Sequence, residues 1–210
     1  MYKISLIFTL LTTSAFLKAQ VPSFELQPMP EQYQEVKPTV LFQAGNRYIW
    51  IGTEQGLFRF DGLDYQPFLM LDSICNNKVT AIGEIGDRLW VGYEDGRVFF
   101  QAKAKFQLWQ IEEGLPNAPI TGFGQGANEL IWVATYGEGL YYHNGRHLYN
   151  INTDDGLPGD DIYTIHVDPE GDAWVGTDGG LSRCKVRAEQ KQITTIGKAE
   201  GMPDEIVRAV

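Results

Sequence analysis

The segment 48–60, YIWIGTEQGLFRF, decides the fold, because three further segments of the chain follow the same plan. They are RLWVGYEDGRVFF at 88–100, LIWVATYGEGLYYH at 130–143 and DAWVGTDGGLSRC at 172–184. Their tryptophans are separated by 40, 42 and 42 residues and are Trp50, Trp90, Trp132 and Trp174. A second phrase keeps the same period: EEGLPN at 112–117, DDGLPG at 154–159 and EGMPDE at 200–205. A repeat of about 41 residues therefore organises the sequence.

This period is typical of two architectures, a solenoid of helix pairs and a propeller of four-stranded blades. Each repeat has an apolar, β-branched run, then glycines, then a second apolar run, which is the pattern of two strands joined by a turn. Asp61-Gly62 and Asn144-Gly145 stand between apolar runs, where hairpin turns with positive φ are expected. Apolar residues nowhere keep a 3.6-residue period over a dozen positions without glycine or proline. The repeat is therefore predicted to be a four-stranded antiparallel meander.

The third repeat predicts strands at about 120–124, 130–135, 140–143 and 147–151, and the fourth at 162–167, 173–177, 181–185 and 192–196. Such sheets cover both apolar faces and protect their edges when they stack radially. We predict an all-β fold, an incomplete β-propeller of about four blades. The blades are expected at approximately 36–70, 77–111, 118–151 and 160–196, with the start of a fifth at 204–210. The four repeated tryptophans are predicted to pack between neighbouring blades.

Four blades are few for a closed propeller, and the sequence stops within a repeat, so we expect an N-terminal fragment of a longer protein. Residues 20–35 are predicted to be a linker or the outer strand that closes the last blade of the intact ring. Residues 1–19 are predicted to be a secretory signal peptide, because Lys3 precedes an apolar stretch at 4–17 and Ala19 offers a small residue for cleavage. The alternative, a membrane anchor, is disfavoured because the stretch is shorter than the ~20 residues that span a bilayer.

The composition and residue spacing argue against several functions and sites: nucleic-acid binding, a disulfide bond and a calcium site. The formal net charge of −10 and pI near 4.7 argue against nucleic-acid binding, which depends on lysine and arginine. Cys75 and Cys184 could pair after export if their Cα atoms approach each other, but two buried thiols are the preferred interpretation. A calcium loop around Asp154 is disfavoured because Gly156 comes one place too late for an EF-hand. No catalytic residue, metal site or cofactor is predicted.

The recurring Trp-(Val/Ile)-Gly-Thr…Gly-Leu phrase, with its (Glu/Asp)-Gly-Leu-Pro partner, resembles the two-component regulator propeller repeat over about residues 36–210. Ala134 replaces the usual glycine of the third copy, and Arg97 the usual leucine of the second. In that family such repeats form the periplasmic sensor region of hybrid two-component systems, especially in Bacteroidota. The resemblance implies a non-enzymatic, periplasmic, ligand-sensing segment. It also implies a parent protein that is a histidine kinase anchored in the inner membrane, with further blades and signalling modules as partners.

Two sets of loops are expected at one end of the propeller: those between the second and third strands of each blade, and those between blades. Aromatic faces, amides and carboxylates in these loops suit the rings and hydroxyl groups of a glycan, so a carbohydrate or other small ligand is predicted there. Each residue is also an ordinary polar loop residue. The alternatives are an exported propeller enzyme of polysaccharide lyase or glycosidase type and a protein-binding scaffold. The candidate ligand-binding residues are Glu54, Tyr93, Glu94, Asn117, Tyr136, Glu138, Asp160 and Asp178.

Overall fold

The computed structural model describes residues 28–68, 77–103, 105–187 and 190–210. The predicted signal peptide and Cys75 lie outside the described residues, as do residues 20–27 of the predicted linker. The helices of the described residues are short 3-10 turns, and none could cross a membrane. Their bounds are η1 (Glu31–Tyr33), η2 (Ala127–Glu129), η3 (Thr153–Asp155) and η4 (Lys198–Glu200).

The described strands form four four-stranded antiparallel sheets, and within each sheet the strands pair in chain order. The first sheet contains β1 (Pro38–Gln43), β2 (Ile49–Thr53), β3 (Gly56–Phe60) and β4 (Tyr65–Phe68). The second contains β5 (Val79–Ile85), β6 (Arg88–Tyr93), β7 (Val98–Ala102) and β8 (Lys105–Leu108). The third contains β9 (Ile120–Gln125), β10 (Ile131–Thr135), β11 (Leu140–His143) and β12 (Leu148–Ile151). The fourth contains β13 (Thr164–Val167), β14 (Ala173–Thr177), β15 (Gly180–Arg187) and β16 (Gln190–Ile196).

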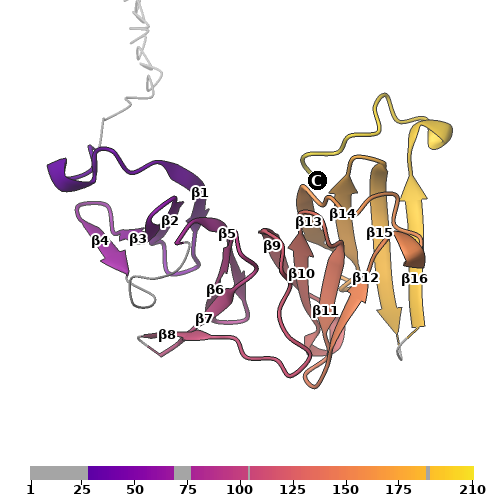
Figure 1. The fold of residues 1–210 in the computed structure, drawn as a ribbon, viewed down its shortest axis with the longest axis horizontal. Helices are drawn as coiled ribbons and strands as arrows, with labels where there is room; N and C mark the ends of the chain where they lie inside the picture. The colour runs from indigo at the N-terminus through magenta and orange to yellow at the C-terminus, as the bar shows by residue number, and fades with distance from the viewer. Residues whose placement is uncertain (1–27, 69–76, 104, 188–189) are drawn as a thin grey trace, which may run out of the picture.

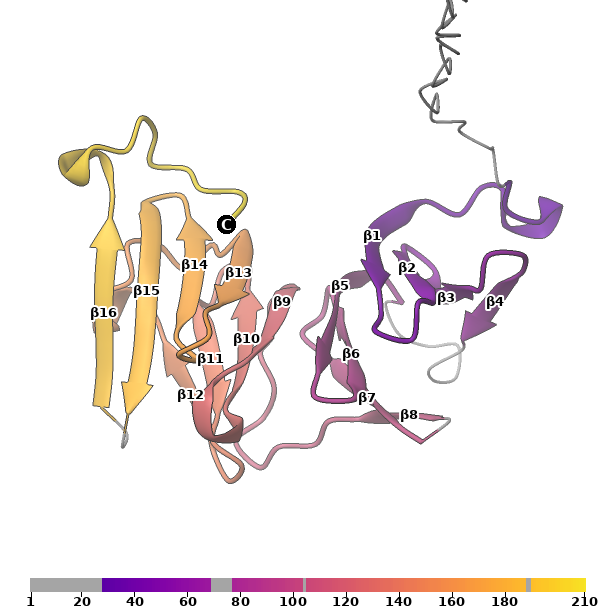
Figure 2. The same ribbon diagram turned by 180° about the vertical axis from the view of Figure 1, so that it is seen from behind.

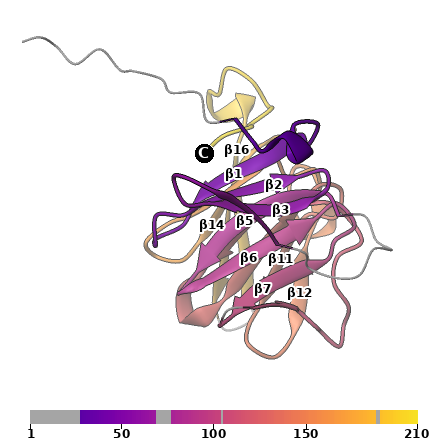
Figure 3. The ribbon, with the colours of Figure 1, turned by 90° about the vertical axis from the view of Figure 1, so that its left-hand side faces the viewer.

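The four sheets are the blades of an open propeller, which confirms the predicted fold class. Figures 1 and 2 show the sheets following one another from the first blade to the fourth, without closing into a ring. The first strands of neighbouring blades contact one another, β1 with β5, β5 with β9 and β9 with β13. In Figure 3 the first blade faces the viewer and the others lie behind it. The first strand of each blade is therefore the innermost, as in a propeller.

The tryptophans of the repeat connect neighbouring blades. Trp50, Trp90 and Trp132 are buried, and each belongs to an apolar cluster that includes residues of the following blade. Trp90, for example, packs with Ile120 of the third blade. Trp174 in the fourth blade is half-buried. Radial stacking thus covers the apolar faces that a single sheet would leave exposed.

The glycine that follows each Trp-(Val/Ile) pair is required by the approach of the next blade. A Cβ atom on Gly92 would lie 2.5 Å from the Cβ of Ile120. One on Gly52 would lie 2.6 Å from Cγ1 of Val79 and 2.5 Å from Cγ1 of Val40 in its own blade. Ile120 and Val79 are the residues at which the next blade begins, and both are fully buried. At the same position of the third blade Ala134 is also fully buried, so a methyl group is accommodated there.

The threonine of the repeat closes the turn between the second and third strands. It is fully buried in the first, third and fourth blades. Its hydroxyl donates a hydrogen bond to a glycine carbonyl at 2.8, 2.7 and 3.1 Å, in the pairs Thr53–Gly56, Thr135–Gly139 and Thr177–Gly180. The three glycines have φ values of 132°, 74° and 133°, a region that favours glycine. The Thr…Gly spacing of the repeat is therefore a turn signature.

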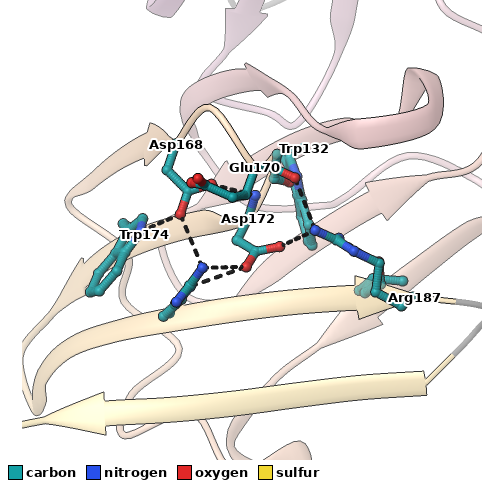
Figure 4. A network of polar contacts seen from close by, with 9 residues as sticks. Trp132, Asp168, Glu170, Asp172, Trp174 and Arg187 are labelled. Carbon is teal, nitrogen blue, oxygen red and sulfur yellow. Dashed lines mark hydrogen bonds and ion pairs between the residues drawn. The ribbon is translucent and has the colours of Figure 1, made fainter.

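A buried carboxylate, that of Asp172, lies in the β13–β14 turn of the fourth blade, at the end opposite the threonine turns (Figure 4). The Asp172 side chain is fully buried and accepts from Nε of Arg183 at 3.0 Å, and it forms an ion pair with Arg187 at 2.7 Å. Asp168 accepts hydrogen bonds from the Trp174 indole and the Asp172 amide, both at 2.9 Å. These contacts hold the β13–β14 turn against β15, so the network has a structural role.

Candidate functional site

The predicted binding loops lie together at one end of the blades. In the third blade, the end of the second strand and the turn after it form backbone hydrogen bonds with two segments. One segment leads into the first strand of the same blade, and the other leads into the first strand of the fourth blade. Within the third blade the Tyr136 amide donates to the Pro119 carbonyl at 2.9 Å, and toward the fourth the Ile162 amide donates to the Thr135 carbonyl at 3.0 Å. We call this face the loop end. It comprises residues 54–55, 93–96, 117–119, 136–139, 159–163 and 178–179.

Glu138 and Asn117, both predicted from the sequence, are brought into contact. The Glu138 carboxylate accepts from the Asn117 amide at 3.1 Å and from the Tyr141 hydroxyl at 2.9 Å. Burial, followed by the hydrogen bond to Glu138 and its charge, raises the pKa of Tyr141 to about 12. One carboxylate oxygen of Glu138 therefore accepts both hydrogen bonds and links its own loop to the loop of Asn117. Asn117 itself is exposed.

Asp160 and Asp178 lie at the boundary between the third and fourth blades. The Asp160 carboxylate accepts from the Thr153 amide at 2.9 Å and from the Thr153 hydroxyl at 3.1 Å, which anchors η3. The Asp160 carbonyl accepts from the amides of Gly137 and Gly139 at 3.1 and 3.0 Å. Asp178 is exposed, and its carboxylate lies so close to Gly159 that a Cβ there would collide with it. Asp160 therefore has a structural role, and Asp178 remains accessible.

Glu54 and Glu94 form an acidic pair around Lys78 on the first two blades. Glu94 forms an ion pair with the Lys78 ammonium group, and the Glu94 amide donates to the Lys78 carbonyl at 3.0 Å. The hydrogen bond and charge of Glu94 raise the pKa of Lys78, and the exposed Glu54 adds a smaller effect in the same direction.

Tyr93 lies in the core and not at the surface that the sequence predicted. It is 1% exposed, and its ring packs 5.5 Å from that of Phe99. Burial raises the pKa of its hydroxyl group. Tyr93 is the last residue of β6 and occupies the position of the buried repeat threonines, so its side chain points into the blade. A comparison with those threonines could have revealed this.

The structure adds three residues that the sequence did not single out: Asp161 and Tyr163 lie beside Tyr136, and Arg208 lies beside Tyr163. Tyr136 is 45% exposed, and its ring lies 5.8 Å from that of Tyr163. The negative charge of Asp161, followed by Tyr163, raises the pKa of Tyr136. The guanidinium carbon of Arg208 lies 5.7 Å from the Tyr163 ring centre. We call Tyr136, Asp161, Tyr163 and Arg208 the tyrosine cluster.

A period-two pattern could have found part of this cluster. Ile162 is fully buried where the fourth blade begins, so Tyr163 points the other way. Val207 donates its amide to the Thr177 carbonyl at 2.9 Å, as Ile162 does to Thr135, so Arg208 corresponds to Tyr163 one repeat later. The tyrosine cluster thus offers aromatic faces, a carboxylate and a guanidinium group in a small area. Among the residues that the structure describes, no group of three or more His, Cys, Asp or Glu side chains could hold a metal ion.

Solved structures similar to this chain are propellers. The extracellular domain of the hybrid two component system BT3049 from B. thetaiotaomicron is 23% identical, with a TM-score of 0.68, over 86% of this chain and 26% of that one. The corresponding domain of BT4673 from the same organism is 24% identical, with a TM-score of 0.63, over 77% of this chain and 22% of that one. Virginiamycin B lyase from Staphylococcus aureus is 13% identical, with a TM-score of 0.64, over 85% of this chain and 62% of that one.

These likenesses show the propeller fold, and the chain spans about a quarter of the length of the two B. thetaiotaomicron domains. No curated protein matches the sequence. The family model "Two component regulator propeller" matches residues 156–179, which run from the Gly-Leu-Pro phrase to the turn after the fourth repeat tryptophan. Three further blades are built on the same motif. The chain is therefore similar to the two component regulator propeller family through the repeat at residues 156–179, and it shares the propeller fold of the B. thetaiotaomicron extracellular domains.

Proposed function

We propose that this chain is the ligand-sensing propeller segment of a hybrid two-component signalling protein and that it works in the periplasm. Its repeat family and its likeness to extracellular domains of hybrid two component systems support this proposal. Residues 1–19 would direct export. The parent protein would carry the remaining blades and the kinase modules and would be anchored in the inner membrane. The segment itself would bind its ligand without converting it.

The ligand that we propose is a carbohydrate, bound at the loop end. The observation that carries this proposal is the tyrosine cluster, in which Tyr136 is 45% exposed beside a carboxylate and a second tyrosine. The apolar face of a sugar ring packs on an aromatic face, while its hydroxyl groups can donate to Asp161 and accept from Arg208. The accessible Asp178 adds a second carboxylate at the same end of the blades.

The loop end is suited to sensing because its parts come from different blades. The backbone hydrogen bonds from Gly137 and Gly139 to Asp160 already connect the third blade to the segment that leads into the fourth. A ligand held by Tyr136 and Tyr163 would contact two blades at once. Its binding energy would therefore favour one arrangement of those blades over another, which is the requirement for a signal.

Calorimetric titration of the full chain with a panel of oligosaccharides and a panel of short peptides tests this proposal. We expect heat from at least one oligosaccharide and an affinity about tenfold lower in Tyr136→Ala, because an aromatic contact contributes up to ~1.5 kcal/mol beyond its buried area. Tyr65→Ala, on the outer strand of the first blade, is the matched control and should bind as the unmodified chain does.

Three results would contradict parts of the proposal. Heat from peptides with none from oligosaccharides would favour a protein-binding scaffold. Conversion of an oligosaccharide, detected as new masses after incubation, would favour the exported-enzyme alternative. Equal losses in the Tyr136 and Tyr65 variants would show that the ligand binds away from the tyrosine cluster.

A further inference from the structure

A pocket of about 450 Å³ lies between the second and third blades, outside the loop end. Its rim comes from the β5–β6 turn, which carries Asp87 and Arg88, and from the β9–β10 turn, which carries Glu129. Turns between first and second strands lie at the end of the blades opposite the loop end. The volume is at the small end of the ~300–1,000 Å³ typical of small-molecule sites.

The walls of the pocket are aromatic. Trp90, Phe100, Trp109 and His143 line it. The Trp90 ring lies 5.4 Å from Phe100 in a stacked arrangement and 5.1 Å from Trp109 at an interplanar angle of 88°. Trp109 in turn meets the His143 ring at 5.2 Å and 77°. The rings therefore form a corner of nearly perpendicular walls.

The rim carries charges of both signs that form no ion pair within the described part of the chain. Asp87, Arg88 and Glu129 are exposed, and none of them forms an ion pair or side-chain hydrogen bond with another described residue. The Arg88 guanidinium lies over the Phe100 ring at 5.7 Å, so it is held at the edge of the aromatic wall. The Gln125 side-chain oxygen accepts from the Gly86 amide at 2.9 Å, which joins the two turns across the pocket.

The pocket is lined by one ring nitrogen that is buried in its wall and by one that can donate a hydrogen bond. Trp90 is 4% exposed, and its indole nitrogen has no hydrogen-bond partner among the described residues. In the next blade the equivalent Trp132 donates to the Gly171 carbonyl at 3.3 Å. The Trp50 nitrogen also lacks a partner, but Trp50 does not line this pocket. His143 accepts the Gly145 amide on Nδ1 at 3.2 Å, so its neutral ring carries a proton on Nε2.

The β9–β10 turn is held in an unusual backbone conformation beside the pocket. Asn128 and Glu129 have φ values of 55° and 61°, in the left-handed region that non-glycine residues rarely adopt. The corresponding turn of the fourth blade has Gly171 at φ 82°. Residues in this region are enriched at ligand sites, where the surrounding structure holds them. The conformation places Glu129 on the rim.

We propose that this pocket binds a small zwitterion with an aromatic side chain, for which a free aromatic amino acid is the simplest form. The ammonium group would face Asp87 and Glu129, and the carboxylate would face Arg88. The aromatic ring would enter the pocket between Phe100 and His143, the two half-buried rings of its lining. This site is separate from the loop end, so the proposal does not depend on the carbohydrate ligand.

A zwitterion fits these observations better than a neutral sugar or a simple anion. A neutral sugar would leave the charges of Asp87, Arg88 and Glu129 without counter-charges. Trp90 and Trp109, only 4% and 8% exposed, offer no broad face for a sugar ring. A simple anion would leave the two carboxylates of the rim opposed to its charge. A ligand with one charge of each sign and an apolar body matches the rim and the walls together.

Titration calorimetry of the full chain with L-phenylalanine tests this proposal, and two analogues separate the charges. Phenethylamine lacks the carboxylate, and 3-phenylpropionate lacks the ammonium group. We expect Arg88→Gln to weaken L-phenylalanine at least about tenfold, the effect of losing a charge-assisted hydrogen bond, and to leave phenethylamine unchanged. Glu129→Gln should weaken L-phenylalanine and phenethylamine but not 3-phenylpropionate. Phe100→Leu removes a half-buried aromatic wall of the pocket and should weaken L-phenylalanine and both analogues.

Arg146→Gln is the matched control, because Arg146 is an exposed arginine next to Gly145 that does not line the pocket. It should bind L-phenylalanine as the unmodified chain does. The proposal is overturned if L-phenylalanine gives no heat at millimolar concentration, or if Arg146→Gln weakens it as much as Arg88→Gln does. Binding of methyl β-glucoside in its place, sensitive to Glu129→Gln, would also overturn it and would indicate a sugar site.

Discussion

The substitution Gly92→Ala tests the claim that close blade stacking selects the glycine of the repeat. Gly92 lies in β6 with extended backbone, so alanine there meets a problem of space and not of conformation. The added Cβ would lie 2.5 Å from Cβ and 2.6 Å from Cγ2 of Ile120. Ordinary carbon contacts are ~3.5–4.0 Å, so the third blade must move away by about 1 Å.

The expected loss is about 2 kcal/mol in the free energy of unfolding. Overpacking of a core by one methyl group costs about 1–3 kcal/mol, and the lower chain entropy of alanine in the unfolded state returns about 0.5 kcal/mol. Urea unfolding of the full chain, followed by tryptophan fluorescence, measures this change. The buried tryptophans of the neighbouring clusters report on the contact between blades.

Two further variants make the test specific. Gly45→Ala adds a methyl group that meets only the flexible Glu84 carboxylate, at 3.4 Å, and should change the free energy by less than about 0.5 kcal/mol. Ala134→Gly removes a fully buried methyl group at the same repeat position and should cost about 1 kcal/mol. If Gly92→Ala were as stable as Gly45→Ala, the close approach to Ile120 would not explain the glycine.

Three other outcomes are expected. Asp172→Asn leaves Arg187, now 2.7 Å from a buried carboxylate, without its charge partner, and should lower the free energy of unfolding by about 2 kcal/mol in the same urea assay, a value reduced by the partial exposure of the arginine. The pKa of Tyr141 is raised by burial and by Glu138 to about 12, so its stabilising effect is complete below its ordinary pKa of 10.0 and is lost as the pH rises from there to about 12. Tyrosinate absorbance compared with Tyr141→Phe measures this titration, and an unchanged pKa in Glu138→Gln would refute the role of the carboxylate. For Asp168, burial alone would raise the pKa, but hydrogen bonds from an indole and a backbone amide hold it below 3.8, so its stabilising effect is lost as the pH falls below that value. Acid unfolding of Asp168→Asn should therefore begin from a lower neutral-pH stability and fall less steeply.

Much of the fold could be predicted because its signals are local. The strands predicted for the third repeat at 130–135 and 140–143 are observed at Ile131–Thr135 and Leu140–His143. The fourth repeat shows where local signals fail, since β15 extends to Arg187, two residues beyond the predicted end. Arg187 pairs with Asp172, fifteen positions earlier in the chain. The two additional residues at the end of β15 thus include one that forms an ion pair with Asp172, and the alternation of apolar and polar residues does not predict such a pair.

The candidate site was less predictable, because polar loop residues look alike until their partners are known. Tyr93 follows a glycine, precedes the polar Glu94 and Asp95 and resembles a loop residue, yet it is 1% exposed. Glu138 and Asp160 were predicted to face a ligand, but their carboxylates accept hydrogen bonds from Asn117 and Thr153, respectively. Asn117 comes from a different loop than Glu138, and the stacking of the blades decides which loops lie side by side.

Strand, turn and repeat length are properties of residues within a few positions of one another, so the amino-acid order alone was enough to specify a blade and to count its copies. The faces of neighbouring blades bring together residues that are far apart in the sequence, such as Gly92 with Ile120 and Tyr136 with Tyr163. Which side chains are buried, paired or left exposed at those faces follows from the angle and distance between sheets. That geometry arises from packing all the blades at once, and it created both the tyrosine cluster and the pocket beside Trp90.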